Sequence, residues 1–94
     1  MFNVTILTKP ECHLCHVVVK MASRVQADVP FTLRQVDISN DTDLLARYGT
    51  RIPVVLIDGR EILEGRITEG SMRSALKKAR WRRPISRILS RLRR

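Results

Sequence analysis

Two cysteines separated by two residues are the part of this chain best suited to chemistry: Cys12 and Cys15. The sequence has no other cysteine, so these thiols pair either with each other or with a partner. At the start of a helix, this spacing lets two sulfurs meet across one turn, where a disulfide forms and breaks without moving the rest of the chain. In a reducing compartment, a lone close pair indicates a catalytic or metal-binding role more than a structural one.

The apolar pattern around the cysteines predicts the elements that position them. A β-branched, apolar run over residues 2–7 predicts a buried strand, which Pro10 ends. Apolar residues then recur at helical spacing between His13 and Ala27, and Cys12 falls near the N-cap of this helix. The apolar positions of the helix are Leu14, Val17, Val18, Met21, Ala22 and Val25.

The rest of the chain predicts an α/β fold with the element order βαβαββα. Further strands are expected over 31–37, 54–57 and 61–63, with a hairpin turn at Asp58-Gly59. One helix follows capping oxygens at 39–41 and ends at Gly49, and another follows Thr68. A strand, a crossover helix and a second strand form a parallel pair, and the hairpin adds antiparallel strands. We therefore expect a four-stranded mixed sheet flanked by helices, with Cys12 at the C-terminal end of the first strand.

Two segments of this pattern resemble a small glutaredoxin-like protein of the thioredoxin superfamily. They are Thr-Lys-Pro-Glu-Cys-His-Leu-Cys at 8–15 and Arg-Ile-Pro-Val at 51–54, and the likeness covers roughly residues 2–79. The resemblance implies a cis peptide bond between Ile52 and Pro53, with the proline packed beside the cysteine pair. It also implies that the Ile52 backbone forms a docking edge for an extended substrate.

The chemistry of the cysteine pair follows from its position. A thiolate, not a thiol, attacks a disulfide, and a helix N-terminus offers unpaired N–H groups and a positive dipole end to an anion. We therefore assign Cys12 as the nucleophile and Cys15, one turn deeper, as the resolving thiol. Lys9 and protonated His13 are expected to tune the redox balance, by charge and by analogy with other members of the superfamily.

The reductant is predicted less directly. The resemblance implies glutathione binding by a lysine before the motif, by the cis-proline backbone and by a Gly-Gly-x-Asp-like turn. Lys9 and Pro53 match, whereas the turn here contains Gly65 and Arg66 and lacks the second glycine and the aspartate, so that Arg66 or Thr68 would have to substitute. We expect no tightly bound cofactor. Glutathione, another low-molecular-weight thiol and a protein reductase are the candidate reductants.

Other hypotheses use the same residues. Cys12-x-x-Cys15-His16 fits the pattern for c-type haem attachment, but haem attachment normally follows export and the N-terminus shows no signal peptide. Two cysteines and two histidines within five residues do not easily converge on one tetrahedral metal, so no metal site is expected within one chain. A metal or Fe–S centre bridging two glutaredoxin-like chains stays open as an alternative.

The net charge of +9 comes from the C-terminal end of the chain. Residues 1–76 hold nine basic and nine acidic residues, whereas 77–94 hold nine basic residues and no acid. After Pro84, which is expected to interrupt the last helix, apolar residues at 85, 88, 89 and 92 alternate with arginines. Residues 81–94 are therefore predicted to be a basic amphipathic tail, following a glutaredoxin-like domain over 1–80. Its expected partner is an anionic membrane surface or an acidic protein, and nucleic acid is disfavoured.

Taken together, the sequence predicts a thiol–disulfide oxidoreductase that reduces protein or mixed disulfides and contributes to electron transport and cell redox homeostasis. We expect it in the cytoplasm, with a peripheral membrane location through the tail. The alternative from another class is a non-catalytic thioredoxin-fold binding module that the tail recruits to its partner.

Overall fold

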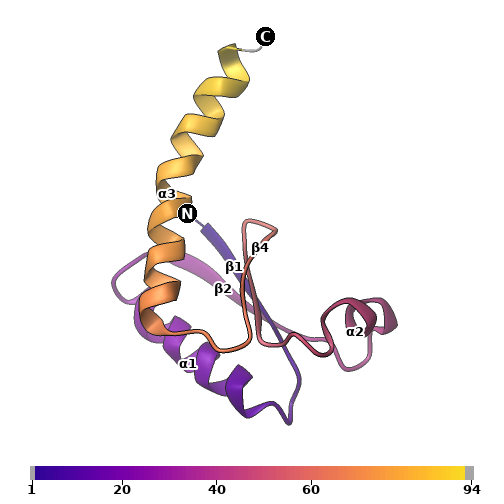
Figure 1. Ribbon diagram of the computed structural model, residues 1–94. Helices are drawn as coiled ribbons and strands as arrows, with labels where there is room; N and C mark the ends of the chain where they lie inside the picture. The colour runs from indigo at the N-terminus through magenta and orange to yellow at the C-terminus, as the bar shows by residue number, and fades with distance from the viewer. Residues whose placement is uncertain (1, 93–94) are drawn as a thin grey trace.

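The element order is the one that the sequence predicts. The computed structural model describes residues 2–92, and side chains as far as Arg80. The elements are β1 (Phe2–Thr8), α1 (His13–Gln26), β2 (Phe31–Asp37), α2 (Thr42–Tyr48), β3 (Val54–Ile57), β4 (Arg60–Glu64) and α3 (Glu69–Leu92) (Figure 1). This βαβαββα order confirms the expected α/β class.

The four strands form one mixed sheet in the order β2-β1-β3-β4. β1 runs parallel to β2, with the crossover helix α1 between them in the chain. β3 lies antiparallel to β1, so that Leu7 pairs with Val54, and β4 lies antiparallel to β3. The β3–β4 hairpin turns at Asp58 and Gly59, both at positive φ (50° and 83°), as a two-residue hairpin turn requires.

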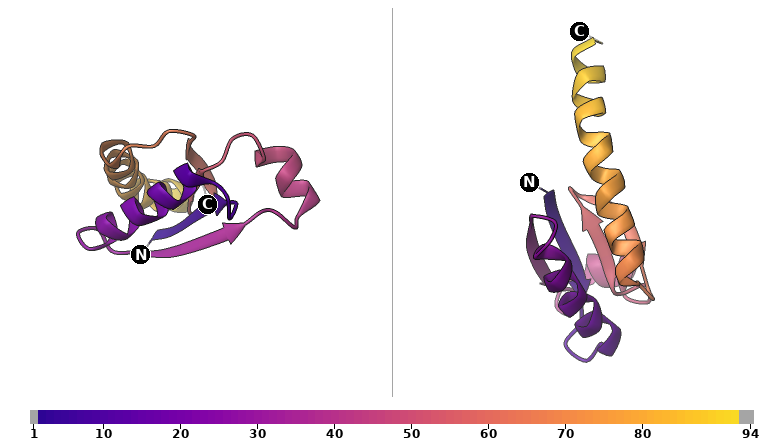
Figure 2. Two further views of the ribbon diagram at one scale, coloured as in Figure 1. Left: turned by 90° about the horizontal axis from the view of Figure 1, so that it is seen from below. Right: turned by 90° about the vertical axis from the view of Figure 1, so that its left-hand side faces the viewer.

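The helices cover the sheet on both faces. Adjacent strand residues point to opposite faces, and Ile6 belongs to one core cluster while Leu7 belongs to the other. The larger cluster joins the sheet to α1 and α3, which lie together on one side (Figure 2). The smaller one joins it to α2 through the buried Tyr48. Buried residues of the larger cluster are Phe2, Val4, Ile6, Val18, Met21, Ala22, Val25, Phe31, Val55, Ile57, Ile67, Met72, Ala75 and Leu76.

The predicted helix caps are present as hydrogen bonds. The Asp41 carboxylate accepts the Leu44 N–H at 3.0 Å and so caps α2. At the start of α3 the caps are reciprocal: Thr68 Oγ1 accepts the Ser71 N–H at 3.0 Å, and Ser71 Oγ accepts the Thr68 N–H at 3.1 Å. These bonds satisfy N–H groups that have no partner within the helix.

The last helix is longer than the sequence predicts. α3 continues to Leu92, and the interruption expected at Pro84 is wrong. A proline inside a helix removes one backbone hydrogen bond, and the flanking turns can continue the helix across it with a bend. In Figure 1 the C-terminal half of α3 extends beyond the sheet. The side chains of the predicted tail, 81–94, lie outside the described residues, so its separate role stays a prediction.

No helix in the part of the chain described here is both long and apolar enough to cross a membrane.

The packing of α3 on the sheet can be tested at Leu76, which is only 1% exposed in the larger cluster. Replacing Leu76 with alanine removes buried methyl groups and leaves a cavity, so we expect a loss of about 2–5 kcal/mol in the free energy of unfolding. Urea denaturation followed by circular dichroism measures this loss.

Lys77→Ala, one residue along the same helix at an exposed position, is the control and should change the stability little. Equal stabilities for the Leu76 and Lys77 variants would contradict the packing of α3 described above.

Candidate active site

Cys12 occupies the N-cap of α1, where its spacing predicts it. Beyond Thr8, the last residue of β1, a hydrogen bond from the Cys12 N–H to the Lys9 carbonyl (3.1 Å) closes a turn into the helix. Cys12 keeps an extended backbone (φ −86°, ψ 107°), and its Sγ accepts the Cys15 N–H at 3.2 Å. The sulfur thus takes the place of the side-chain oxygen that usually caps a helix.

A disulfide joins Cys12 to Cys15, and their Cα atoms are 5.3 Å apart. Cys15 is fully buried under the first turn of α1, whereas Cys12 is half-buried. The first turn of α1 contains no acidic residue, so no carboxylate of that turn offsets the positive end of the helix dipole at Cys12. Cys12 is therefore the more accessible cysteine, in a setting that favours a negative charge on its sulfur.

The Ile52–Pro53 segment meets the cysteine loop at the same edge of the sheet. Leu7 pairs with Val54 across β1 and β3, so the next residue after Leu7 and the one before Val54 lie at the same level. The Ile52–Pro53 peptide bond is cis. Pro53 is fully buried, and Ile52 is half-buried against the smaller core cluster. The antiparallel β1–β3 pairing thus brings two segments together that are about 40 residues apart in the chain.

The other predicted site residues lie around this edge. Lys9 is half-buried in the turn before Cys12, and His13 is exposed as the first residue of α1. Gly65 follows β4 at φ 70°, and its N–H donates to the Pro53 carbonyl at 2.9 Å. The glycine turn therefore lies directly beside the proline, and Arg66 follows it at an exposed position.

The start of α3, just after the predicted thiol-binding residues Gly65 and Arg66, already has internal partners. Thr68 and Ser71 cap each other there, and Glu69 contributes a carboxylate to the first turn. Glu69 contacts Arg24 at 3.2 Å and Arg73 at 3.4 Å. At the helix start, the Thr68 and Ser71 N–H groups and the Glu69 carboxylate are therefore already engaged within the protein.

Two apolar residues of α1 are exposed beside the disulfide. The sequence places Leu14 and Val17 on the apolar face of the helix, yet they are 42% and 41% exposed. The buried side of the first turn is instead formed by Cys15 and Val18. The three-residue spacing of Leu14 and Val17 puts both on one side of the helix, near its N-terminal end.

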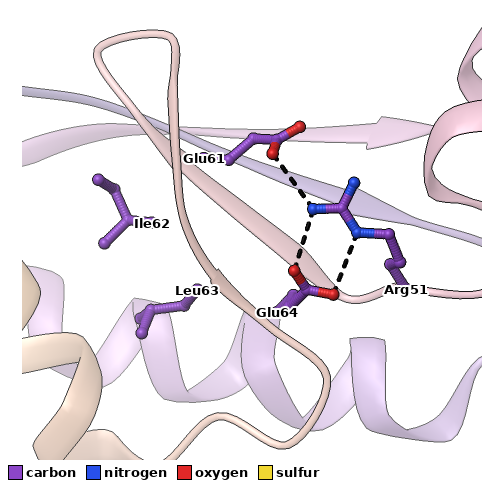
Figure 3. Close-up of a pocket in the computed structure, with 5 residues that line it drawn as sticks. All are labelled: Arg51, Glu61, Ile62, Leu63 and Glu64. Carbon is purple, nitrogen blue, oxygen red and sulfur yellow. Dashed lines mark hydrogen bonds and ion pairs between the residues drawn. The ribbon is translucent and has the colours of Figure 1, made fainter.

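A charged cluster adjoins the Ile52–Pro53 segment, and sequence analysis did not find it. The Arg51 guanidinium donates to both carboxylate oxygens of Glu64, at 3.1 and 3.0 Å, and to Glu61 at 3.2 Å (Figure 3). It also lies over the Tyr48 ring, 5.2 Å from the centroid. Arg51, Glu61 and Glu64 line a pocket of about 100 Å³ together with Ile62 and Leu63.

These contacts shift the pKa values of the groups in the cluster. The Arg51 guanidinium lowers the pKa of the Glu64 carboxyl through their hydrogen bonds. The pKa of Glu61 is lowered first by a hydrogen bond with Tyr48 and then by Arg51. The same bond to Glu61 raises the pKa of Tyr48, and both carboxylates raise that of Arg51. At neutral pH the cluster is therefore an arginine held between two carboxylates above a neutral tyrosine.

The sequence contains only an indirect signal for this cluster. Arg51 precedes the predicted cis-proline by two residues, and Glu61 begins the predicted strand 61–63, three residues before Glu64, which follows that strand. Such a spacing puts them on opposite faces of a regular strand. The register shift between Val55 and Leu56 in the β3–β4 pairing changes the local geometry, and it cannot be seen from the sequence.

Comparisons with known proteins agree with this architecture. Residues 3–77 match the model of the family described as Glutaredoxin-like domain (DUF836). The uncharacterized protein Rv0508 of Mycobacterium tuberculosis is 27% identical over 92 residues, which cover 93% of this chain and 95% of that protein.

Solved structures show the same fold. The X. campestris target protein XcR50 is 30% identical, with a TM-score of 0.69 over 80% of this chain and 96% of that one. Oxidized thioredoxin O2 from Arabidopsis thaliana is 15% identical, with a TM-score of 0.62 over 83% and 74%. The second likeness concerns the fold alone. The family match covers most of the chain, and so the protein belongs to the glutaredoxin-like family.

Proposed function

We propose that this protein is a thiol–disulfide oxidoreductase that reduces disulfides in proteins or mixed disulfides. The observation that carries the proposal is the Cys12–Cys15 disulfide at the N-cap of α1, with one cysteine accessible and the other buried. The exposed apolar surface of Leu14 and Val17 beside it suits contact with a polypeptide.

The first step is attack by the reduced protein. The Cys12 thiolate attacks one sulfur of a substrate disulfide, forms a mixed disulfide and expels the other sulfur as a thiolate, which takes a proton from solvent. The Cys15 N–H, already directed at the Cys12 sulfur at 3.2 Å, and the dipole of α1 favour the thiolate over the thiol. Further positive charge comes from Lys9, in the turn before Cys12, and from protonated His13, the first residue of α1.

The second step releases the product. The Cys15 thiol loses a proton and attacks the Cys12 sulfur, which restores the internal disulfide and frees the second substrate thiol. The two electrons have then passed from the dithiol to the substrate. The short reach between the two residues, whose Cα atoms are 5.3 Å apart, makes this attack intramolecular.

The cycle closes when an external thiol returns two electrons to the disulfide. Glutathione, another small thiol or a protein dithiol has the required chemistry. The start of α3 favours the protein dithiol, because the Thr68 and Ser71 N–H groups already have side-chain partners there and Glu69 is already paired with two arginines. We therefore propose a protein reductase as the main electron source.

Serine variants of the two cysteines separate their roles. Cys12→Ser should abolish turnover of an insulin or mixed-disulfide substrate, because no nucleophile remains at the helix start. Cys15→Ser should keep the first step and accumulate the mixed disulfide, because the resolving thiol is gone. Mass spectrometry of the quenched reaction detects the adduct.

Wild-type protein with a chemical dithiol as reductant is the positive control for this experiment. Absence of turnover by the wild type with every reductant would contradict the enzyme proposal. An adduct on Cys15 of the Cys12→Ser variant, with none on Cys12 of the Cys15→Ser variant, would reverse the two roles.

We further propose that residues 81–94 attach the protein to an anionic membrane surface. α3 continues through this region to Leu92 and extends beyond the sheet (Figure 1). The sequence supplies a helical repeat of apolar residues with arginines between them, and no acidic residue follows Glu69. A basic amphipathic helix of this kind binds anionic lipids by combining apolar burial with charge attraction.

Full-length protein should therefore co-sediment with phosphatidylserine-containing vesicles and not with phosphatidylcholine vesicles. Replacing Arg83, Arg87 and Arg91 with glutamine should weaken this binding at least tenfold, since each basic residue near an anionic surface contributes about 1 kcal/mol.

The matched control removes the same charge from exposed positions of the domain, by replacing Lys20, Arg34 and Arg60 with glutamine. Equal losses for the two triple variants, or no binding of the wild type to anionic vesicles, would reject the membrane proposal. The second result would leave an acidic protein as the partner to seek.

A further inference from the structure

The charged cluster around Arg51 has no place in the chemistry described above. Arg51 stands immediately before Ile52 and Pro53, but its guanidinium contacts β4: both Glu64 oxygens at 3.1 and 3.0 Å, and Glu61 at 3.2 Å. A planar guanidinium that makes two parallel bonds to one carboxylate is fixed in orientation as well as in position. Arg51 is thus held toward the edge strand.

The backbone of the same segment is held at both ends. The Arg51 N–H donates to the Tyr48 carbonyl at 2.8 Å, at the end of α2. Two residues later, the Pro53 carbonyl accepts the Gly65 N–H at 2.9 Å, just beyond β4. Ile52 lies between these two hydrogen bonds, so both of them limit the movement of its backbone.

The face of the guanidinium is supported as well. Arg51 lies over the Tyr48 ring at 5.2 Å, and the ring is 5% exposed and packs in the smaller core cluster. A cation over an aromatic face is attracted to it, and a buried ring does not move aside. The Arg51 guanidinium therefore contacts Tyr48 of α2 on its face and Glu61 and Glu64 of β4 at its edge (Figure 3).

We propose that Arg51 is a positioning residue that holds the Ile52 backbone ready for an extended polypeptide, so that the site favours polypeptide disulfides over small-molecule disulfides. This inference rests on the proposed oxidoreductase function. A small disulfide needs only the Cys12 sulfur. An extended peptide also needs a backbone edge already in place, and ordering that edge beforehand saves entropy on binding.

Stability alone does not explain the cluster. Its side chains are between one third and one half exposed, and ion pairs at such positions contribute little to folding. Their geometric effect is larger, because misplacement of a binding element by about 1 Å can cost up to 100-fold in rate. The two-bond ion pair between Arg51 and Glu64 therefore affects the position of Ile52 more than it affects the stability of the fold.

The test compares two substrates that share a leaving group. One is hydroxyethyl disulfide, and the other is an extended cysteine peptide joined to 2-mercaptoethanol by a disulfide. Second-order rate constants of the reduced protein with each are measured by acid quenching and mass spectrometry. We expect Arg51→Ala to lower the rate with the peptide roughly tenfold and to change the rate with hydroxyethyl disulfide less than twofold.

Further variants separate positioning from a general structural effect. Arg51→Lys keeps the charge but cannot make the two parallel bonds to Glu64. Its rate constant with the peptide should lie between those of wild type and Arg51→Ala. Glu64→Gln should also lower the rate with the peptide. The Arg51→Ala/Glu64→Gln double variant should react with the peptide no more slowly than Arg51→Ala alone, because both changes break the same interaction. The Cys12–Cys15 reduction potential should stay unchanged in all of them.

Arg73→Ala is the matched control. Arg73 is equally exposed and also bridges two carboxylates, those of Asp28 and Glu69, away from Ile52. This variant should leave both rate constants as in wild type. Equal loss with both substrates in Arg51→Ala, no loss with either, or the same peptide-specific loss in Arg73→Ala would overturn the inference.

Amide hydrogen exchange keeps the inference testable apart from the enzyme proposal. The backbone N–H groups of residue 51 and Gly65 are bonded to the Tyr48 and Pro53 carbonyls, and their exchange should be faster in Arg51→Ala than in wild type and unchanged in Arg73→Ala. If wild type reduces neither substrate, the oxidoreductase proposal fails, and unchanged exchange then rejects the positioning by Arg51 too. If wild type reduces both and Arg51→Ala does so equally well, only the positioning proposal fails.

Discussion

The antiparallel pairing of β1 with β3 is the constraint on which the site depends. It places the end of one strand beside the beginning of the other, with Leu7 opposite Val54. The cysteine loop leaves β1 at this point, and the Ile52–Pro53 segment enters β3 there. Because both strands are buried in the middle of the sheet, their relative position is set by the core and not by the loops. The cysteine loop and the Ile52–Pro53 segment are thus brought together by strand pairing and core packing.

Local patterns in the sequence were sufficient for the elements and for the cysteine pair. The alternation in β1, the helical spacing after His13, the turn residues at Asp58-Gly59 and the caps at Asp41 and Thr68 all act within a few residues. Each is therefore readable without knowledge of the fold. The resemblance to glutaredoxin-like proteins rested on this order, on the cysteine spacing and on the segments at 8–15 and 51–54, and the family match confirms it.

The parts that escaped prediction depend on long-range geometry. Leu14 and Val17 fit the apolar face of α1 by spacing, yet both are exposed, because Cys15 and Val18 form the buried side of this end of the helix. The Arg51 cluster needs the β3–β4 register and its irregularity, which the sequence does not encode at short range. Pro84 disfavours a continuous helix locally, yet α3 continues past it to Leu92.

The charges that surround Arg51 also affect how the sheet meets other molecules. β4 is an edge strand, and an edge strand with open hydrogen-bonding groups can pair with another chain and begin aggregation. β4 is only five residues long, its pairing with β3 is irregular, and it bears Arg60, Glu61 and Glu64. A neighbouring strand would have to bring its own backbone against these charges. The same residues that engage Arg51 thus make this border of the sheet a poor template for unwanted β-association.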